Sequence, residues 1–512
     1  MNLNKTLLEE DFRLPTDLEI NPVSDLPEKV IQFGEGNFLR AFVDWMIDRL
    51  NQQKLFNGHV VVVQPIEKGL IDLLNQQDGL YTLLLRGIEK GRVVEKKRLV
   101  TAISRALNPY ADWQGYLSCA ENPDLRFIVS NTTEAGIAYE AEALVQGQPL
   151  QSFPAKLAAF LFHRFSFFNG DPQKGMLILP CELIDKNGVK LKELILRHSQ
   201  AWQLPVAFDN WITEHNHFFN TLVDRVVTGY PRDEADRLWE TLGYRDQLLD
   251  TGEIFHLWII EGESRFKVEL PLEQIGLNVV WTADLTPYRE RKVRVLNGIH
   301  TMTVAVAHLC GLETVKEAVE DPLVGQFMHK GLFTEILPLL PLAEAEKKAY
   351  ADGVLERFQN PFIRHRWMDI ALNSISKFKT RCLSTLIDNH QANGKPPALL
   401  SFSLAALLTL YRGDKLSDGK LAAISEKGPY DVSDDRRTLE FFLSCWHAPS
   451  GNHQKNFQGT AKQILGNAEL WGLDLNQLTG LADSVADALA RISTRGMRPA
   501  LETLLDGKGT AP

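Results

Sequence analysis

Three polar residues that lie close together in the sequence have side chains suited to proton transfer. Lys292, Asn297 and His300 occur in the segment 288–310, which holds many valine, leucine and alanine residues. At about 100° per residue the three fall within an arc of about 140° on one helical face. A lysine among apolar neighbours can exchange protons near neutral pH, an asparagine amide can donate to a developing alkoxide, and a histidine can orient a substrate hydroxyl. The alternative is a basic interface helix with exposed charges and a satisfied core histidine.

A glycine-containing turn between an apolar run and an amphipathic helix is a second candidate. The run over 29–33 leads into Gly34-Glu35-Gly36, and the helix expected over 38–51 follows. At such a turn, backbone N–H groups and the helix dipole can hold a pyrophosphate. Leu39 stands where the third glycine of the dinucleotide-binding motif belongs, so the pattern also fits an ordinary turn between a strand and a helix.

A second loop carries hydroxyl and amide groups directly after a strand-like run. The run covers 127–130, and the loop Ser130–Gly136 contains Thr133 and Glu134. Ligands of open α/β sheets lie beyond the carboxyl ends of the strands, so this loop is a candidate to bind the nicotinamide ribose of a dinucleotide. It equally fits the start of a helix, with a threonine as N-cap and the glutamate in the first turn.

The type of dinucleotide is left open by the spacing. In NAD-binding folds of this kind, an acidic residue at the end of the second strand accepts a hydrogen bond from the adenosine ribose. Here the β-branched run 59–63 is followed by neutral Gln64, and Glu67 comes three positions later. This arrangement does not distinguish NAD from NADP.

Around these candidates, the first half of the chain alternates between strand-like and helix-like segments. The strand-like runs cover 29–33, 59–63, 81–85, 99–104, 127–130 and 176–179, and helices are expected over 38–51, 154–167 and 189–202. Such alternation predicts an α/β domain with a mostly parallel sheet and helices on its faces. We expect this domain, of the Rossmann type, to span residues 1–285.

From about residue 286 onward, long amphipathic segments replace the β-branched runs. They cover 288–310, 315–330, 343–357, 364–377, 397–411, 435–446, 459–465 and 475–491. We therefore expect an all-α C-terminal domain over 286–512, with the lysine segment just past the domain boundary.

Composition excludes several other classes of protein. The 512 residues carry 65 acidic and 55 basic side chains, a net charge of −10, which gives no reason to expect nucleic-acid binding. The five cysteines are odd in number and form no C-x-x-C pair, so neither a disulfide framework nor a thiolate metal site is expected. The most apolar segment, 398–411, is too short to span a membrane, and the first 17 residues lack an apolar signal region. These features favour a protein of the reducing cytoplasm.

His215 and His217 are the one pairing that invites a metal. The segment 211–219 around them is expected to be helical, and no carboxylate or third histidine has convincing spacing. We expect no metal.

Taken together, the motifs resemble the mannitol dehydrogenase family, the long-chain polyol dehydrogenases. The resemblance rests on the glycine turn with Phe38 and Arg40, on Thr133-Glu134-x-Gly136, on Val223-Asp224-Arg225, and on Lys292-x4-Asn297-x2-His300. A further part is Arg357-Phe-x-Asn360-Pro361, which leads to Asn373-x3-Lys377-x3-Arg381. The similar stretch covers roughly residues 30–412.

This resemblance implies a metal-free, NAD-dependent oxidoreductase. Lys292 would be the general acid that protonates a ketone oxygen, and the base in reverse, Asn297 would help to form the oxyanion pocket, and His300 would contact substrate hydroxyls. The other residues carried over from the family as substrate contacts are Asp224, Lys377 and Arg381. Those implied to bind the cofactor are Val30, Ile31, Gln32, Phe33, Gly34, Glu35, Gly36, Asn37, Phe38, Leu39, Arg40, Ala41, Thr133 and Glu134.

Two departures from the polyol-dehydrogenase pattern bear on the substrate. Leu183 stands where the family has a second asparagine that donates to the alkoxide, and Asp369 stands where it has an arginine. Both argue against mannitol or fructose and agree with a uronate, whose carboxylate requires a cation. Lys377, Arg381 and Arg364 are the candidates for that cation.

We therefore expect a small-molecule hexulosonate or aldonate as substrate, with D-tagaturonate reduced reversibly to D-altronate in galacturonate breakdown. Fructuronate or a polyol is the alternative within the family, and a catalytically silent nucleotide-binding protein is the alternative outside it. We expect no nucleic-acid or membrane partner, and the sequence is equally compatible with a monomer and a dimer.

Overall fold

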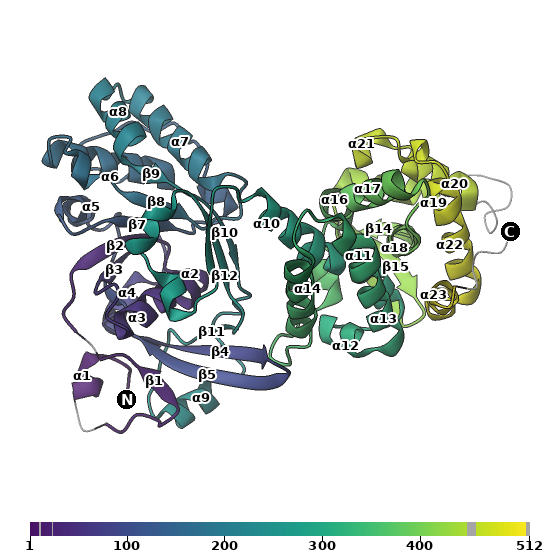
Figure 1. Ribbon diagram of the computed structural model, residues 1–512, viewed down its shortest axis with the longest axis horizontal. Helices are drawn as coiled ribbons and strands as arrows, with labels where there is room; N and C mark the ends of the chain where they lie inside the picture. Colours follow the sequence, from purple (N-terminus) through teal and green to yellow (C-terminus); the bar gives the residue numbers. More distant parts are fainter. Residues whose placement is uncertain (10–11, 23, 448–456, 508–512) are drawn as a thin grey trace. The chain divides into compact units, whose positions relative to one another are not determined.

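The computed structural model describes residues 1–9, 12–22, 24–447 and 457–507 (Figure 1). The chain forms two compact units, residues 1–285 and 286–512, which are described separately below. In the part of the chain so described, no helix combines the length and the apolar character that a membrane crossing requires.

A parallel six-stranded sheet is the centre of the N-terminal unit. Its order is β6-β3-β2-β7-β8-β9, and all neighbouring strands pair in parallel. This is the strand order of a dinucleotide-binding fold built from two mononucleotide-binding halves. The strands are β2 (Glu28–Phe33), β3 (His59–Val63), β6 (Ile103–Leu107), β7 (Phe127–Ser130), β8 (Leu177–Pro180) and β9 (His217–Phe218).

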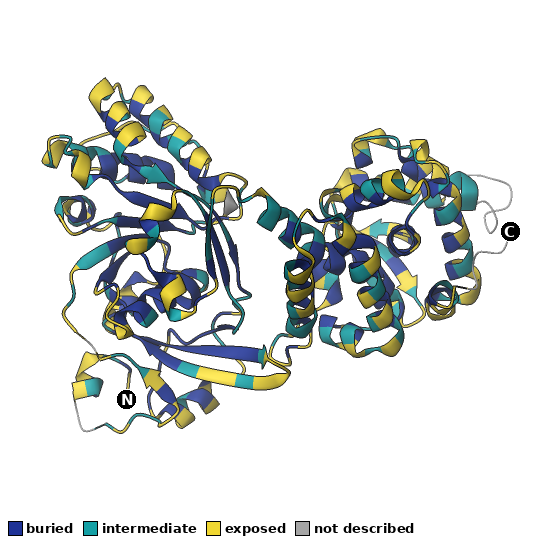
Figure 2. Ribbon diagram, in the orientation of Figure 1, coloured by how far each residue is buried: buried dark blue, intermediate teal, exposed yellow. Residues whose placement is uncertain are grey.

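Successive residues of the central strands enter two different cores. In β3, Val60 and Val62 face one core, whereas Val61 and Val63 face the other. Because side chains alternate along a strand, an unbroken run of valines is what a strand covered on both faces requires. Figure 2 shows these strands as buried.

Helices cover the two faces of this sheet. The second core includes residues of α5 (Trp113–Ser118), α6 (Phe153–Phe167), α7 (Asn187–Ala201) and α8 (Val206–His215). The first core includes α3 (Trp45–Gln52) and α4 (Ile71–Gln76). The unit also contains α1 (Lys5–Glu9), α2 (Asn37–Leu39) and α9 (Ala235–Leu242).

Two further sheets complete the N-terminal unit, and neither was expected. The first has the order β1-β5-β4-β11 and the second the order β10-β12-β13. Their strands are β1 (Leu18–Ile20), β4 (Tyr81–Glu89), β5 (Arg92–Val100), β10 (Asn220–Asp224), β11 (Asp250–Glu253), β12 (Leu257–Glu261) and β13 (Val279–Thr282). The run at 81–85 is thus a strand, but it belongs to a mixed sheet beside the parallel one.

Two local predictions need correction. The single strand expected over 99–104 is the end of β5 and the start of β6, because the backbone N–H of Thr101 donates to the Asp48 carboxylate (2.9 Å) and not to a neighbouring strand. The helix expected over 211–219 ends at His215, and β9 begins at His217.

The second unit is dominated by helices, and the expected fold class is confirmed. The helices are α10 (Thr286–Arg291), α11 (Gly298–Leu309), α12 (Val315–Glu320), α13 (Pro322–Lys330), α14 (Glu344–Phe358), α15 (Trp367–Ile370), α16 (Ser374–Arg381), α17 (Leu383–Asn393), α18 (Ala398–Leu410), α19 (Arg436–Trp446), α20 (Phe457–Leu465), α21 (Ala468–Trp471), α22 (Leu481–Arg495) and α23 (Met497–Leu505). The segment 315–330 divides at Asp321, whose carboxylate caps α13. The segment 364–377 divides at Asn373, which has a positive φ of 54°.

A small antiparallel sheet adds to this helical unit. It consists of β14 (Gly413–Ser417), β15 (Lys420–Ser425) and β16 (Gly428–Val432). Its strands are short and largely exposed, and they lack a β-branched run. A search for apolar periodicity therefore does not find them.

Candidate active site

The carboxyl ends of β2, β3 and β7 meet at the glycine turn. The N–H of Gly34 donates to the carbonyl oxygen of Val63 (3.0 Å), and the N–H of Asn131 donates to that of Phe33 (3.0 Å). Gly34 has a φ of 122°, and a Cβ on it would lie 2.9 Å from the Asn131 oxygen. Only glycine fits this position, because other residues adopt such a φ at a cost and have no room for a side chain.

The turn has an open side that matches the requirement of a pyrophosphate. A Cβ built on Gly36 would meet no atom within 4 Å. Gly36 is also the N-cap of α2, and as a glycine it provides no side-chain cap for the first N–H groups of the helix. Backbone N–H groups at the start of a helix attract anions. The turn at 34–36 therefore fits the phosphates of a dinucleotide, although the third glycine is missing.

Arg40 supports this turn from within the protein. Its guanidinium donates to the Glu35 carbonyl oxygen (3.3 Å) and to the Asn37 side chain (2.6 Å), and it lies 3.9 Å from the Asp250 carboxylate. Both charged groups are buried. Burial raises the pKa of Asp250 to about 7, although Arg40 acts in the opposite direction. We conclude that Arg40 holds the turn in shape and that its side chain is not presented to a phosphate.

The second loop, after β7, is strained. Thr133 has a φ of 70° and a ψ of 168°, a region that is almost restricted to glycine. Such strain costs about 1–3 kcal/mol and is concentrated at functional sites. Glu134 begins a short 3-10 turn, Glu134–Gly136, and its side chain lies outside the described part of the structure. The observed strain supports a binding role for this loop over a simple helix cap.

Glu182 holds this loop in place, a role that the sequence did not reveal. Its carboxylate accepts hydrogen bonds from the Thr132 N–H (2.9 Å), the Thr132 hydroxyl (3.0 Å) and the Ser130 hydroxyl (3.0 Å). Burial raises its pKa, and these hydrogen bonds counteract the shift. Glu182 lies after β8, so it connects the ends of β7 and β8. The neighbouring Leu183 is 62% exposed.

The three residues of the lysine motif lie on one continuous helical segment. A π-helical turn, Lys292–Asn297, joins α10 to α11, and His300 is the third residue of α11. In a π-helix the hydrogen bonds join residues five apart, so Asn297 follows Lys292 by about one turn. The two residues are therefore better aligned than the regular α-helix predicted from the sequence would place them. Both are half-buried.

His300 offers one unpaired nitrogen. The ring is 9% exposed and hydrogen-bonds to the Leu296 carbonyl oxygen, whereas Nε2 is buried without a partner. Nδ1 is thus the protonated nitrogen, and Nε2 is an acceptor. Burial lowers the pKa of His300 well below its usual value, and the nearby side chains of His365, Arg357 and Arg381 lower it further. A neutral histidine with a free acceptor is suited to hold a substrate hydroxyl.

Cationic side chains gather near His300. Arg381 donates weakly to the Thr301 hydroxyl (3.5 Å), and burial lowers its pKa. Lys377 donates to the Ile370 carbonyl oxygen (2.8 Å), and burial together with Arg381 lowers its pKa. Arg364, by contrast, is exposed and lies 3.7 Å from Glu313, in an ordinary surface ion pair.

Two other positions singled out from the sequence lie on different elements. Asp369 is exposed, on the short helix α15. Asp224 is buried at the end of β10, in the N-terminal unit, where it is opposite Leu257 in the antiparallel pairing.

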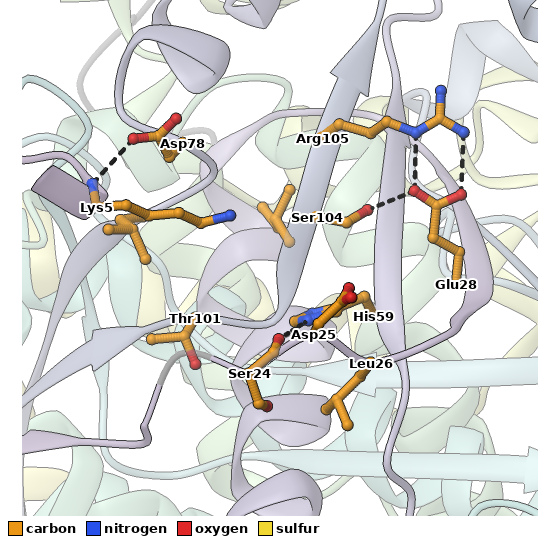
Figure 3. A pocket seen from close by; sticks show the side chains of 12 residues that line it. Lys5, Ser24, Asp25, Leu26, Glu28, His59, Asp78, Thr101, Ser104 and Arg105 are labelled. Atoms are coloured by element: carbon orange, nitrogen blue, oxygen red, sulfur yellow. Dashed lines mark hydrogen bonds and ion pairs between the residues drawn. The ribbon is translucent and has the colours of Figure 1, made fainter.

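A cavity of about 550 Å³ lies at the opposite edge of the parallel sheet (Figure 3). It is lined by Glu28 and His59, which begin β2 and β3, and by Arg105 of β6. Glu28 accepts two hydrogen bonds from Arg105 (2.7 and 2.9 Å) and one from the Ser104 hydroxyl (2.9 Å). These groups satisfy one another, and ligands of such sheets bind at the carboxyl edge, so we do not assign the active site here.

The described residues contain no group of three or more His, Cys, Asp and Glu side chains arranged to hold a metal ion. All five cysteines are buried free thiols.

Two family models together match most of the chain. A family model described as the mannitol dehydrogenase Rossmann domain matches residues 28–274, and one described as the mannitol dehydrogenase C-terminal domain matches residues 284–493. An altronate oxidoreductase from Shigella flexneri is 45% identical over 504 residues, which cover 98% of this chain and 100% of that protein. An altronate oxidoreductase from Escherichia coli (strain K12) has the same identity and coverage.

Two solved structures share the fold. A substrate-free D-sorbitol dehydrogenase aligns with a TM-score of 0.78 and 21% identity, covering 98% of this chain and 100% of its own. Pseudomonas fluorescens mannitol 2-dehydrogenase, solved with NAD and D-mannitol, aligns with a TM-score of 0.69 and 20% identity, covering 99% and 100%. The resemblance inferred from the sequence motifs is confirmed, and the chain belongs to the mannitol dehydrogenase family.

Proposed function

We propose that this protein is an NAD-dependent oxidoreductase that interconverts D-tagaturonate and D-altronate. The observation that carries the proposal is the arrangement on one helix of Lys292, Asn297 and a neutral His300 with an unpaired acceptor. The family assignment and the full-length similarity to altronate oxidoreductases support the same conclusion. Such an enzyme acts on a CH–OH group in one direction and on a ketone in the other.

NAD is the cofactor. The open turn at 34–36 fits its pyrophosphate, and the strained loop around Thr133 fits the nicotinamide ribose. When bound, the reduced cofactor supplies the hydride that reaches the ketone carbon. The remaining chemistry is left to the side chains of the chain itself.

Lys292 supplies the proton in our proposal. During reduction its ammonium group protonates the oxygen of the ketone, and the Asn297 amide donates a hydrogen bond to the same oxygen as charge develops on it. His300 Nε2 accepts a hydrogen bond from a substrate hydroxyl and fixes the sugar chain. Because Lys292 must be protonated for reduction and neutral for oxidation, the two directions have opposite pH preferences.

The cations near His300 are the proposed site of the substrate carboxylate. Arg381 and Lys377 are only partly exposed. Arg381 lowers the pKa of His300, and Lys377 lowers the pKa of the adjacent His365. Partial burial strengthens the attraction between a guanidinium and a carboxylate. Arg364 is paired at the surface and is the weakest of the three candidates.

The mechanism is tested with Lys292→Ala. We expect NADH oxidation with tagaturonate to fall by at least about 100-fold, the usual contribution of a positioned general acid. NADH binding, followed by fluorescence, should remain. Lys316→Ala is the matched control, because this lysine is partly exposed and pairs with Glu320 on α12. Retention of most of the turnover in Lys292→Ala would show that the proposed mechanism is wrong.

The substrate is tested with a panel of tagaturonate, fructuronate and fructose. We expect tagaturonate to have the highest kcat/KM. We expect Arg381→Leu to raise KM for the two uronates by about tenfold or more, since a charge-assisted pair contributes about 1.5–3 kcal/mol, and to leave fructose unaffected. Arg364→Ala serves as the control. If fructose is the best substrate, the uronate assignment fails. Tight NADH binding without turnover on any substrate would instead favour a silent nucleotide-binding protein.

A further inference from the structure

The strand that usually selects the dinucleotide ends here without an acidic side chain. β3 is followed by Gln64, which is buried. The Gln64 amide nitrogen donates to the carbonyl oxygens of Ile66 (2.8 Å) and Glu67 (2.9 Å). Both of its N–H groups are therefore used to shape its own loop. In NAD-binding folds this position carries an Asp or Glu that accepts from the ribose 2′-hydroxyl.

A carboxylate from the turn after β2 lies close to Gln64 at the end of β3. Glu35, the middle residue of the glycine turn after β2, has its side chain directed toward the end of β3. A Cβ built on Gly69 would lie 2.1 Å from Glu35 Oε1 and 2.5 Å from Gln64 Oε1. The two oxygens thus lie close to each other and to Gly69. Any residue other than glycine at position 69 would displace them.

The environment of Glu35 is unusual for a charged group. The residue is 8% exposed, and it forms no ion pair with any residue that the structure describes. Burial raises its pKa, whereas hydrogen bonds from its own N–H and from the Leu70 N–H, together with the charge of nearby Arg40, act in the opposite direction. A carboxylate has about four acceptor positions. The carboxylate can therefore accept further hydrogen bonds from a ligand in addition to the two from backbone N–H groups.

We propose that Glu35 takes over the role of the missing acidic residue of β3. It accepts hydrogen bonds from the adenosine ribose of NAD and repels the 2′-phosphate of NADP. This inference rests on the proposed use of NAD. Glu35 is a specificity-determining residue in this proposal, and the loop 65–70 closes over it through Leu70 and Gly69.

The test compares the binding of NADH and NADPH to the full-length protein by isothermal titration calorimetry. Glu35→Gln keeps the size of the side chain and an acceptor for the Leu70 N–H, but it removes the charge. We expect the ratio of the Kd for NADPH to the Kd for NADH to fall at least about tenfold, because the repulsion of the phosphate is lost. Glu67→Gln is the matched control, since Glu67 is the exposed acidic residue of the same loop.

Each outcome decides the question. An unchanged ratio in Glu35→Gln refutes the assignment, and a fall in Glu67→Gln alone transfers the role to Glu67. Circular dichroism and the thermal midpoint show whether the variant is folded. If Glu35→Gln is unstable, Glu35→Ser should give the same fall in the ratio. If the unaltered protein binds neither dinucleotide, the proposed cofactor is wrong, which differs from a failure of the Glu35 assignment alone.

Discussion

His256 makes the stability of the N-terminal unit depend on pH. Its Nε2 accepts a hydrogen bond from the Asn278 N–H (3.0 Å), and its Nδ1 lies 3.3 Å from the Ile254 carbonyl oxygen. This arrangement requires the neutral ring, because a protonated Nε2 would face an N–H donor. Burial and the nearby Arg225 lower the pKa of His256 to about 3. The ring also packs edge-on against Trp45, the first residue of α3.

The size of the effect follows from this shift. In the unfolded chain His256 titrates near 6.5. As the pH falls below that value, the unfolded chain binds a proton that the folded form cannot accept, so the folded state loses stability down to about pH 3. One pKa unit corresponds to about 1.4 kcal/mol, so a change from pH 7.5 to 5.5 costs about 1.4 kcal/mol. For a unit of this size, this lowers the thermal midpoint by roughly 3–6 °C.

The measurement is differential scanning calorimetry at the two pH values, on the unaltered protein and on His256→Gln. Glutamine provides an acceptor for the Asn278 N–H and does not titrate. Other histidines with lowered pKa values contribute to both proteins alike, namely His198, His217, His300, His308 and His365. The difference between the two proteins therefore isolates His256. Equal shifts of the midpoint in both proteins would refute the reasoning.

Three further substitutions test other parts of the structure. Glu182→Ala leaves the Thr132 N–H without its acceptor. We expect the free energy of unfolding, measured with urea, to fall by about 2–3 kcal/mol, and NADH binding, measured by fluorescence, to weaken. Unchanged values would contradict the role of this carboxylate. Glu335→Ala removes the acceptor of two N–H groups in the first turn of α18. We expect the free energy of unfolding to fall by about 1–2 kcal/mol, and to fall less in Glu335→Gln. Thr133→Gly relieves the strained φ, and we expect the unfolding free energy to rise by about 1 kcal/mol; a decrease would show that the loop is not strained.

Local patterns predicted the parts of the fold that depend on local physics. The valine run of β3 can be satisfied only by a strand covered on both faces, and that strand is found at its predicted bounds. The break at Thr101 could not be predicted in this way, because its cause is a hydrogen bond to Asp48, more than fifty residues earlier in the chain. Likewise, the strands β14–β16 are specified by turns and pairing and have no apolar alternation.

In the candidate site, too, the residues selected by local spacing were predicted, and those that depend on contacts between distant segments were not. Lys292, Asn297 and His300 are neighbours on one helix, so spacing alone was sufficient to select them. Glu182 could not be selected in this way, because its hydrogen bonds join the ends of two separate strands. The sequence places Glu35 in the cofactor-binding turn. It does not predict that the side chain points toward Gly69, because this contact joins two separate loops.

The π-helical turn between α10 and α11 has a consequence for how such an enzyme can change during evolution. A π-turn is equivalent to one residue inserted into an α-helix. Deleting one residue there would restore α-helical bonding and rotate the preceding residues by about 100° relative to α11. Val304 and Ala307 of α11 would keep their places in the hydrophobic core, while Lys292 would point elsewhere. A single insertion or deletion can therefore redirect Lys292, the proposed proton donor, toward a different substrate atom without repacking the helical unit.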